Sequence, residues 1–180
     1  MGIAAQEPEL ISTARLDLLP IRPEHAEEMS AVLSDPALYE FIGGHPPAAA
    51  ELRSRYQIWA VGSPDPAQSW HNWAIRLREE GCLAGWVQAT VSGRAGDRTA
   101  EIAWVVGKPW QRRGIAAEAA RSMVGWLERQ SVRTITAHIH PGHHASASVA
   151  AATGLRPTSE WHDGEVLWCL RTGDLRDLSS

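Results

Sequence analysis

Cysteine is nearly absent from the chain, which has two among 180 residues, Cys82 and Cys169. So few and so distant cysteines exclude a disulfide framework and a Cys-x-x-Cys metal or redox site, and we expect both to be buried, reduced thiols. Long apolar runs are also missing. No stretch approaches the ~20 residues of a membrane-spanning helix, and the N-terminal MGIAAQEPELIST has no basic region followed by an apolar one. The sequence therefore predicts a cytoplasmic protein with no membrane partner.

Lysine is also scarce, and acidic residues outnumber basic ones. Lys108 is the one lysine among 17 basic residues, against 21 acidic residues, and the formal net charge is -4 at pH 7. Domains that bind a nucleic-acid backbone usually carry clustered basic residues and an excess of positive charge, so we expect no nucleic-acid partner. The remaining composition, 44% hydrophobic and 21% charged, is that of a globular protein. The length predicts a single domain over 1–180, with a core over about 12–172.

Hydrophobic periodicity predicts a mixture of strands and helices. Alternation of apolar and polar residues indicates strands at 15–20, 71–77, 83–91, 99–106, 133–140, 156–162 and 165–170. Helical spacing indicates one helix that begins at 23 and three more at 48–59, 116–130 and 145–153. This order predicts a mixed α/β fold. We expect a central, largely antiparallel sheet of six to seven strands, flanked by about four helices.

A short motif, QRRGIA at residues 111–116, lies between the 99–106 strand and the clearest helix. Glycine in such a loop allows the backbone to approach a ligand closely. The first N–H groups of a helix have no acceptor within the helix, and with the helix dipole they form an anion site. Diphosphate is the natural ligand of such a site. The segment is neither a Walker loop, which needs a following Lys-Ser/Thr, nor Gly-x-Gly-x-x-Gly.

This motif resembles that of a known family. QRRGIA is similar to the Q/R-x-x-G-x-G/A motif with which the GNAT superfamily of N-acetyltransferases binds the pyrophosphate of acetyl-CoA. It follows a strand and opens a helix, in the order of elements that the family uses. LSDPALYEFIGGHPP, AEIAWVVGKPWQRRGIAAEAA and HPGHHASASVAAATGL resemble the branch of the ribosomal-protein N-terminal (alanine/serine) acetyltransferases. The resemblance covers about 15–170, nearly the whole chain.

The resemblance implies that acetyl-CoA is the cosubstrate and that no metal is needed. The backbones of Trp104 and Val106 would meet the acetyl and pantetheine groups, and the Val106 amide would donate to the thioester oxygen. His143 stands where this branch usually has asparagine, although imidazole can also donate a hydrogen bond. The residues that the resemblance assigns to cofactor binding are Trp104, Val106, Gln111, Arg112, Arg113, Gly114, Ile115, Ala116, His143 and Ser146.

The activity implied is transfer of an acetyl group to a primary amine, and it needs a base. An α-amine, with a pKa near ~8, is largely protonated at neutral pH and must lose a proton before it attacks. Glu101 is the candidate base, and a structural, salt-bridged carboxylate is the alternative. His140 is the next candidate, since it ends the neighbouring strand. This branch lacks the tyrosine that other GNAT enzymes use as an acid, so Ser146, Ser148 or water must protonate the departing thiolate.

Four histidines, His138, His140, His143 and His144, lie within seven residues of sequence. Histidine is the commonest metal ligand, so a metal-binding protein is one interpretation. In the family interpretation, however, His138 and His140 lie on one side of a strand while His143 and His144 cap a helix. No cysteine or carboxylate lies within the cluster to complete a metal shell. We therefore expect no metal, and either structural histidines or a role for His140 or His143 beside the acceptor or cofactor.

The expected partner is an amine acceptor, and two chemical classes remain open for it. One is a protein N-terminus, and the other is a small amine such as an amino acid, polyamine or antibiotic. A non-catalytic acyl-CoA sensor is the alternative function, and the oligomeric state is open, with a homodimer as one alternative. Four acidic residues lie in segments that flank the acceptor cleft of the family, or are merely solvated: Glu40, Glu160, Asp163 and Glu165.

Overall fold

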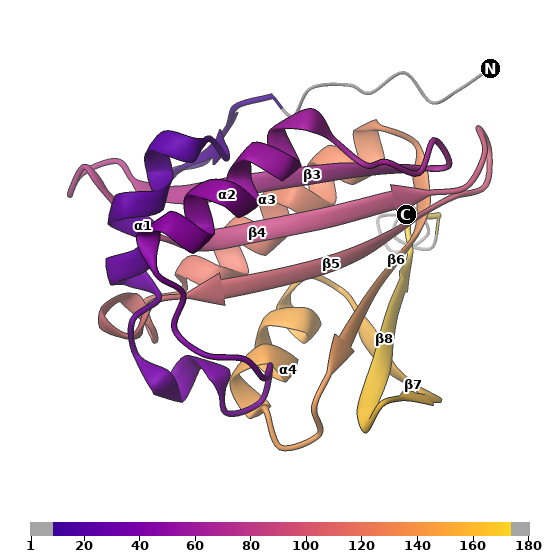
Figure 1. The fold of residues 1–180 in the computed structure, drawn as a ribbon. Coiled ribbons are helices and arrows are strands. Elements are labelled where there is room, and N and C mark those ends of the chain that lie inside the picture. Colours follow the sequence, from indigo (N-terminus) through magenta and orange to yellow (C-terminus); the bar gives the residue numbers. More distant parts are fainter. Residues whose placement is uncertain (1–8, 174–180) are drawn as a thin grey trace.

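The computed structural model describes residues 9–173, and its central element is a sheet of eight strands (Figure 1). The strands lie in the order β1-β2-β3-β4-β5-β6-β8-β7, and every neighbouring pair is antiparallel except β5 and β6. The strands are β1 (Ile11–Ser12), β2 (Leu16–Pro20), β3 (Gln68–Leu77), β4 (Cys82–Ser92), β5 (Arg98–Val106), β6 (Val132–Ile139), β7 (Arg156–His162) and β8 (Glu165–Arg171). The α-helices are α1 (Ala26–Val32), α2 (Ala49–Val61), α3 (Ile115–Arg129) and α4 (His144–Ala152), with short 3-10 helices at Pro23–His25, Pro36–Tyr39 and Lys108–Trp110.

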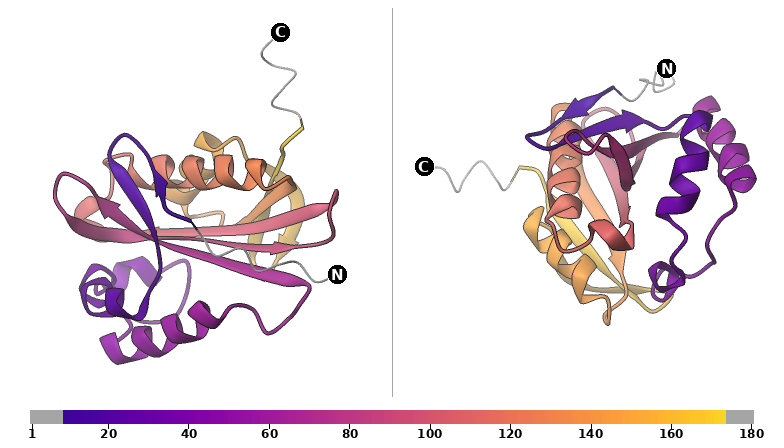
Figure 2. Two further views of the ribbon diagram at one scale, coloured as in Figure 1. Left: turned by 90° about the horizontal axis from the view of Figure 1, so that it is seen from above. Right: turned by 90° about the vertical axis from the view of Figure 1, so that its left-hand side faces the viewer.

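Helices cover both faces of the sheet. α1 and α2 lie on one face, and α3 and α4 lie on the other (Figure 2). Apolar side chains fill the space between the sheet and each pair of helices and form two cores. The larger core, beside α3 and α4, includes Trp73 and Trp126, and the smaller one, beside α1 and α2, includes Met29 and Tyr56. None of the helices that the structure describes has the length and apolar composition of a bilayer-spanning segment.

The mixed α/β fold is confirmed, with two corrections of detail. The sheet has one strand more than the six to seven expected, because β1 pairs with β2 through Ile11 and Ser12. A strand of two residues is too short to show any periodicity. It is held instead by a hydrogen bond of 2.8 Å from the Ser12 hydroxyl to Asp17 and by the turn that follows it. The second correction concerns Cys82 and Cys169, which are free thiols but are half-buried rather than buried.

The helix that follows the motif forms as predicted, shifted by one residue. Its inward positions, among them Ala119, Met123 and Leu127, recur at helical spacing and are buried in the larger core. Gly114 precedes the helix in the left-handed conformation, with φ of 75°. Glycine adopts this conformation without the steric cost that a side chain would bring. The chain can therefore turn sharply from the 108–110 helix into the first turn of α3.

The sheet divides between β5 and β6. These parallel strands pair only where Arg98–Glu101 faces Val132–Thr136. β5 continues along β4 as far as Val106, whereas β6 continues along β8 as far as Ile139. The two strands therefore diverge in a V, with α4 behind the opening in the view of Figure 1.

Candidate active site

A cavity of about 70 Å³ lies in the opening between β5 and β6. Its walls come from both strands, from the loop before α2, from the start of α4 and from the first residue of β8. The lining residues are Phe41, Ile42, Ile102, Ala103, Trp104, Ala137, His138, Ile139, His140, His143, Ser146 and Glu165. Four residues predicted for the site, Trp104, His140, His143 and Ser146, therefore lie around one space. A larger groove of about 440 Å³ beside α1 and the 108–110 helix has none of the predicted site residues in its lining.

Beyond Glu101, the backbone of β5 turns N–H and C=O groups toward this opening that pair with no other strand. The Gly107 N–H donates to the Ala84 carbonyl next to β4, at 2.8 Å. Because N–H groups alternate in direction along a strand, the amides of Trp104 and Val106 point the other way, toward the opening. The Val106 carbonyl on that side accepts a hydrogen bond of 3.0 Å from the Gln111 side chain. The structure thus places the two predicted strand positions with their N–H groups toward the cavity side.

The start of α3 lies at the end of the same strand and offers a row of free donors. Within residues 9–173, the N–H groups of Gly114, Ile115, Ala116 and Ala117 donate no hydrogen bond, and the first bond of the helix runs from the Glu118 N–H to the Gly114 carbonyl at 3.0 Å. Unpaired amides at a helix start attract anions, and the helix dipole adds to the attraction. This geometry fits the pyrophosphate site that the motif predicts.

A brace from the N-terminal part of the chain holds this loop. The Arg15 guanidinium donates to the Arg113 carbonyl at 2.9 Å and pairs with the Glu118 carboxylate at 2.7 Å. Burial acts to raise the pKa of Glu118, but hydrogen bonds from Thr13 and Arg15 outweigh it, and the pKa is lowered. A Cβ at Gly114 would lie 3.4 Å from the Arg15 guanidinium. The bonds of Arg15 therefore tie the loop before α3 to the segment between β1 and β2.

The two arginines of the motif differ in their surroundings. The Arg113 guanidinium pairs with Glu80 in the β3–β4 turn, and this hydrogen bond holds the pKa of the Glu80 carboxyl below its ordinary value. Arg112 has a left-handed backbone, with φ of 63°, and its side chain makes no hydrogen bond with the described part of the chain. Of the two guanidinium groups predicted to bind a cofactor, that of Arg112 is thus the one without a competing carboxylate in this structure.

His140 and His143 pack on the same aromatic ring. The ring of Phe41 lies 5.2 Å from that of His140 and 4.7 Å from that of His143, measured between centroids. The His140 Nδ1 accepts a hydrogen bond of 3.0 Å from the Gly142 N–H, and the His143 Nδ1 accepts one of 3.4 Å from the Ser146 N–H. Burial, together with the nearby His140 charge, lowers the pKa of His143. His143 is thus the N-cap of α4, as predicted, whereas His144, also predicted to cap the helix, is its first residue.

Glu101 lies at the point where β5 and β6 part, and its neighbour is a histidine. The Glu101 Oε1 is 3.4 Å from the Nδ1 of His138 on β6. The His138 side chain is 24% exposed and lines the cavity, whereas that of Glu101 is 62% exposed and is not part of the lining. The predicted base therefore reaches the cavity only through His138.

Three of the four histidines, His138, His140 and His143, line the same cavity, but the four do not gather around one point. His138 faces Glu101, the rings of His140 and His143 pack on Phe41, and His144 is exposed at the start of α4. No group of three or more metal-ligating side chains occurs among the residues that the structure describes.

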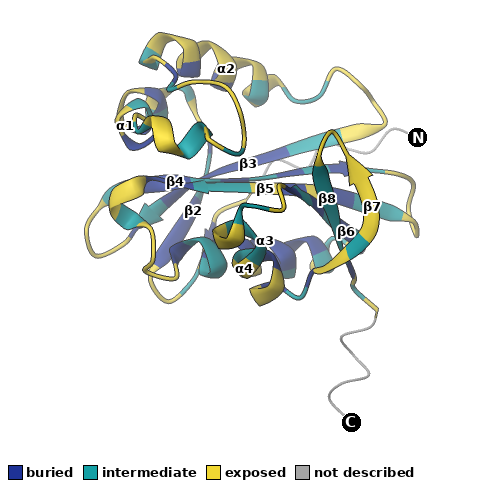
Figure 3. Ribbon diagram, turned by 90° about the horizontal axis from the view of Figure 1, so that it is seen from below, coloured by how far each residue is buried: buried dark blue, intermediate teal, exposed yellow. Residues whose placement is uncertain are grey.

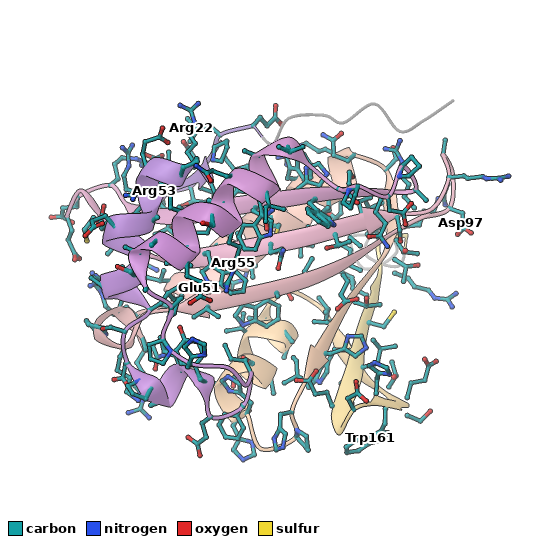
Figure 4. The ribbon with its side chains drawn as sticks, in the orientation of Figure 1. Arg22, Glu51, Arg53, Arg55, Asp97 and Trp161 are labelled. Carbon is teal, nitrogen blue, oxygen red and sulfur yellow. The ribbon has the colours of Figure 1, made fainter. Side chains whose placement is uncertain are left out.

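The last hairpin, β7 and β8, contributes one residue to the cavity lining. β7 is exposed along most of its length (Figure 3), and Trp161, 61% exposed, projects near the free end of the hairpin (Figure 4). Glu165, at the start of β8, lines the cavity, and Asp163 in the turn contacts His162 at 3.2 Å. Three of the four acidic residues expected near an acceptor cleft, Glu160, Asp163 and Glu165, thus lie on this hairpin, and Glu165 is the one that lines the cavity.

Sequence reasoning missed several residues of the site. Phe41 is the one phenylalanine of the chain, and a hint to its role was its place in a segment that resembles the family. Arg15 and Glu80 act on the motif from positions about 98 and 33 residues away, so no local pattern could reveal them. His138 was noted only as a member of the histidine cluster, and its pairing with Glu101 depends on the register of β5 and β6.

Comparisons with known proteins find a matching family model and solved structures of similar fold. A family model described as an acetyltransferase (GNAT) domain matches residues 15–156. Mycobacterium smegmatis RimJ in complex with a CoA disulfide superposes with a TM-score of 0.78 at 18% identity, over 93% of this chain and 90% of that one. A putative ribosomal-protein-serine acetyltransferase from Vibrio cholerae gives 0.71 at 18% identity, over 92% and 99%. The aminoglycoside acetyltransferase AAC(6')-Ib, in complex with coenzyme A, gives 0.73 at 16% identity, over 92% and 99%.

A search of curated protein sequences finds no match to the chain. The similar solved structures, all below 25% identity, show that the fold is shared. The family model carries the stronger conclusion because it covers most of the chain, from the brace at Arg15 through the motif to the start of β7. The protein therefore belongs to the GNAT family of acetyltransferases.

Proposed function

We propose that this protein is an acetyl-CoA-dependent N-acetyltransferase that transfers the acetyl group directly to a primary amine. The observation that carries the proposal is the row of free N–H groups from Gly114 to Ala117, placed at the end of a strand that borders an opening in the sheet. A diphosphate on these amides would leave the rest of a long, thin molecule beside β5.

The chain's own residues fit such a ligand along its length. The amides of Gly114 to Ala117 and the Arg112 guanidinium would hold the pyrophosphate, because all are donors without a competing acceptor in the described structure. Farther along, the outward N–H groups of Trp104 and Val106 would hold the pantetheine and acetyl ends. The Val106 N–H would donate to the oxygen on which charge develops. Bound acetyl-CoA would supply a thioester carbonyl for attack by the amine.

Two cavity-lining groups are suited to protonate the departing thiolate. Ser146 lines the cavity with its side chain unbonded within the described residues, and the neighbouring His143 has its Nε2 free to donate. The earlier candidate Ser148 bonds its hydroxyl to the His144 carbonyl at 3.0 Å and is absent from the cavity lining. Ser146 is therefore the better placed of the two serines to protonate a thiolate.

The acceptor is proposed to be a cationic amine. Glu165 lines the cavity and Glu101 stands beside it, so two carboxylates border the path of an incoming ammonium group. Similar structures are named for acetylation of ribosomal proteins and of an aminoglycoside. A protein N-terminus and a small amine thus remain the two acceptor classes to be compared.

Two measurements test this function. Binding of CoA should raise the melting temperature, because ligand at ~100 times its dissociation constant adds about 2.7 kcal/mol to the native state, on the order of 5–10 °C for a chain of this size. Release of free thiol from acetyl-CoA should then be followed across N-terminal peptides, polyamines and aminoglycosides. No thermal shift at millimolar CoA would contradict the family site. A shift without thiol release for any amine would favour the non-catalytic acyl-CoA sensor.

A further inference from the structure

The three histidines that line the cavity differ in which ring nitrogen is free. His140 and His143 use Nδ1 to accept a backbone N–H. A neutral imidazole carries one proton, so a ring that accepts at Nδ1 carries its proton on Nε2. The free nitrogen of each of these two rings is therefore a hydrogen-bond donor, and neither ring can take a proton there while it is neutral.

His138 has the opposite arrangement. Its Nδ1 lies 3.4 Å from the Oε1 of Glu101, and an ionised carboxylate can only accept hydrogen bonds. The proton of a neutral His138 ring is thus drawn to Nδ1, and Nε2 is left with a lone pair. In an imidazole, the hydrogen-bond partner of one ring nitrogen decides in this way whether the other nitrogen carries a proton.

We propose that His138 is the general base of this acetyltransferase and that Glu101 is a positioning residue that fixes its tautomer. The assignment rests on the proposed function and revises the expectation that Glu101 itself is the base. Three observations support it: His138 lines the cavity, Glu101 is not part of the lining, and the other two histidines present donors.

The proton transfer is simple to balance. The acceptor enters as an ammonium ion, gives one proton to His138 Nε2 and becomes a free amine, while the ring becomes an imidazolium held by Glu101. The nitrogen lone pair forms the C–N bond, and the C–S bond breaks as the sulfur leaves with the electron pair. The second proton of the amine ends on the thiol, and the imidazolium returns its proton to solvent. The net products are an amide, a thiol and one proton.

Several charged or titratable groups face His138 and enter any pH dependence. Glu101 on β5 is one, and Glu165 on β8 lines the same cavity. The ring of His162 on β7 lies 5.7 Å away between centroids, and His140 and His143 line the cavity beyond the end of β6. Glu101 is the one carboxylate within hydrogen-bonding distance of the ring in the described structure.

The first test needs no substrate or cofactor. Nitrogen NMR of the labelled protein at pH 8 reports which ring nitrogen carries the proton, and His138→Ala identifies the signals of His138. We expect the proton of His138 on Nδ1 and those of His140 and His143 on Nε2. Glu101→Gln should shift the His138 signals and leave those of His140 and His143 in place. A wild-type His138 protonated on Nε2 would overturn the proposal.

The second test uses the amine that the thiol-release screen identifies. His138→Ala should lower turnover by about 10² to 10⁴. The turnover of this variant should recover partly as pH rises, because free amine then becomes abundant. Glu101→Gln should lower wild-type turnover but should add no further loss in the His138→Ala background, since it acts only through the ring. Equal losses in both backgrounds would instead make Glu101 an independent base. His144→Ala, which removes an exposed histidine from the same segment, is the matched control with unchanged turnover.

Melting temperatures of all variants separate loss of catalysis from loss of fold. The outcomes also separate the two proposals. If His138→Ala keeps wild-type turnover, the assignment of the base is wrong and the acetyltransferase function stands. If no amine supports thiol release by the wild-type protein, both the function and the base are wrong, whatever tautomer the spectra show.

Discussion

Replacement of Gly114 by valine is the sharpest test of the cofactor site, because its effects on folding and on binding can be measured separately. Gly114 has a φ of 75°, and a Cβ added at this position would lie 3.4 Å from the Arg15 guanidinium. A side chain in the left-handed region costs about 1–2 kcal/mol, which lowers the melting temperature by roughly 2–8 °C for a chain of this length. The fold should survive this loss.

Binding should suffer much more than stability. The methyl groups of Gly114→Val would stand over the N–H groups that are proposed to hold the diphosphate. If two charge-assisted hydrogen bonds are lost at about 1.5–3 kcal/mol each, the dissociation constant of CoA should rise about 10²-fold or more. Isothermal titration calorimetry measures this constant directly, and the thermal shift with CoA should disappear in parallel.

Gly96 supplies a matched control for the strain alone. It lies in the β4–β5 turn with φ of 92°, and a Cβ there would meet nothing within 4 Å. Gly96→Val should therefore have a similar stability cost and bind CoA like the wild-type protein. If Gly114→Val also bound CoA with wild-type affinity, the start of α3 would not be the diphosphate site.

Three further predictions concern charge and metal. Hydrogen bonds from Arg76, Ser12 and Arg78 hold the pKa of buried Asp17 at about 2, so Asp17→Asn should lower the free energy of unfolding by about 2 kcal/mol at pH 7. In urea titrations this difference should vanish as pH falls from 3.8 through 2. A difference that does not depend on pH would contradict the prediction. Burial lowers the pKa of His71 from 6.5 to about 4. The neutral ring should therefore favour the fold above pH 6.5, and the free energy of unfolding should fall by up to about 3 kcal/mol as pH falls to 4. The variant His71→Gln should not show this pH dependence. Treatment with a chelator should change neither melting temperature nor turnover, and one tightly bound zinc per chain would revive the metal interpretation.

Local signals account for most of the fold that the sequence predicts. The strand at 83–91 and the helix at 116–130 differ from β4 and α3 by one residue at each end, because their apolar residues keep one period throughout. β1 escaped prediction because two residues have no period. The motif was found for the same local reason, since a glycine turn and a helix start are contiguous in sequence.

Contacts between distant segments account for what the sequence did not predict. Glu101 and His138 are 37 residues apart, and only the register of two parallel strands shows that they meet. The pairing of Arg113 with Glu80 likewise needs the β3–β4 turn to lie beside the start of α3. Three of the four histidines, His138, His140 and His143, line one cavity, yet they have different hydrogen-bond partners because they lie in a strand, in a turn and at a helix N-cap.

The division of the sheet links the cofactor site to the proposed base. Glu101 faces Thr136 at the last paired position of β5 and β6, and beyond it β5 offers unpaired N–H groups. His138 is two residues past Thr136 on β6, so its side chain projects from the same face of the sheet as that of Glu101. The Glu101 carboxylate on β5 can therefore reach the His138 imidazole on β6, because the two strands have only just begun to diverge at this point. Closer to the 98–101 segment the strands leave no room for a ligand, and near Val106 they are not paired at all. The discontinuity that exposes the amides of Trp104 and Val106 thus also places an acid–imidazole pair beside them, which is where an acetyl group held by those amides would meet an incoming amine.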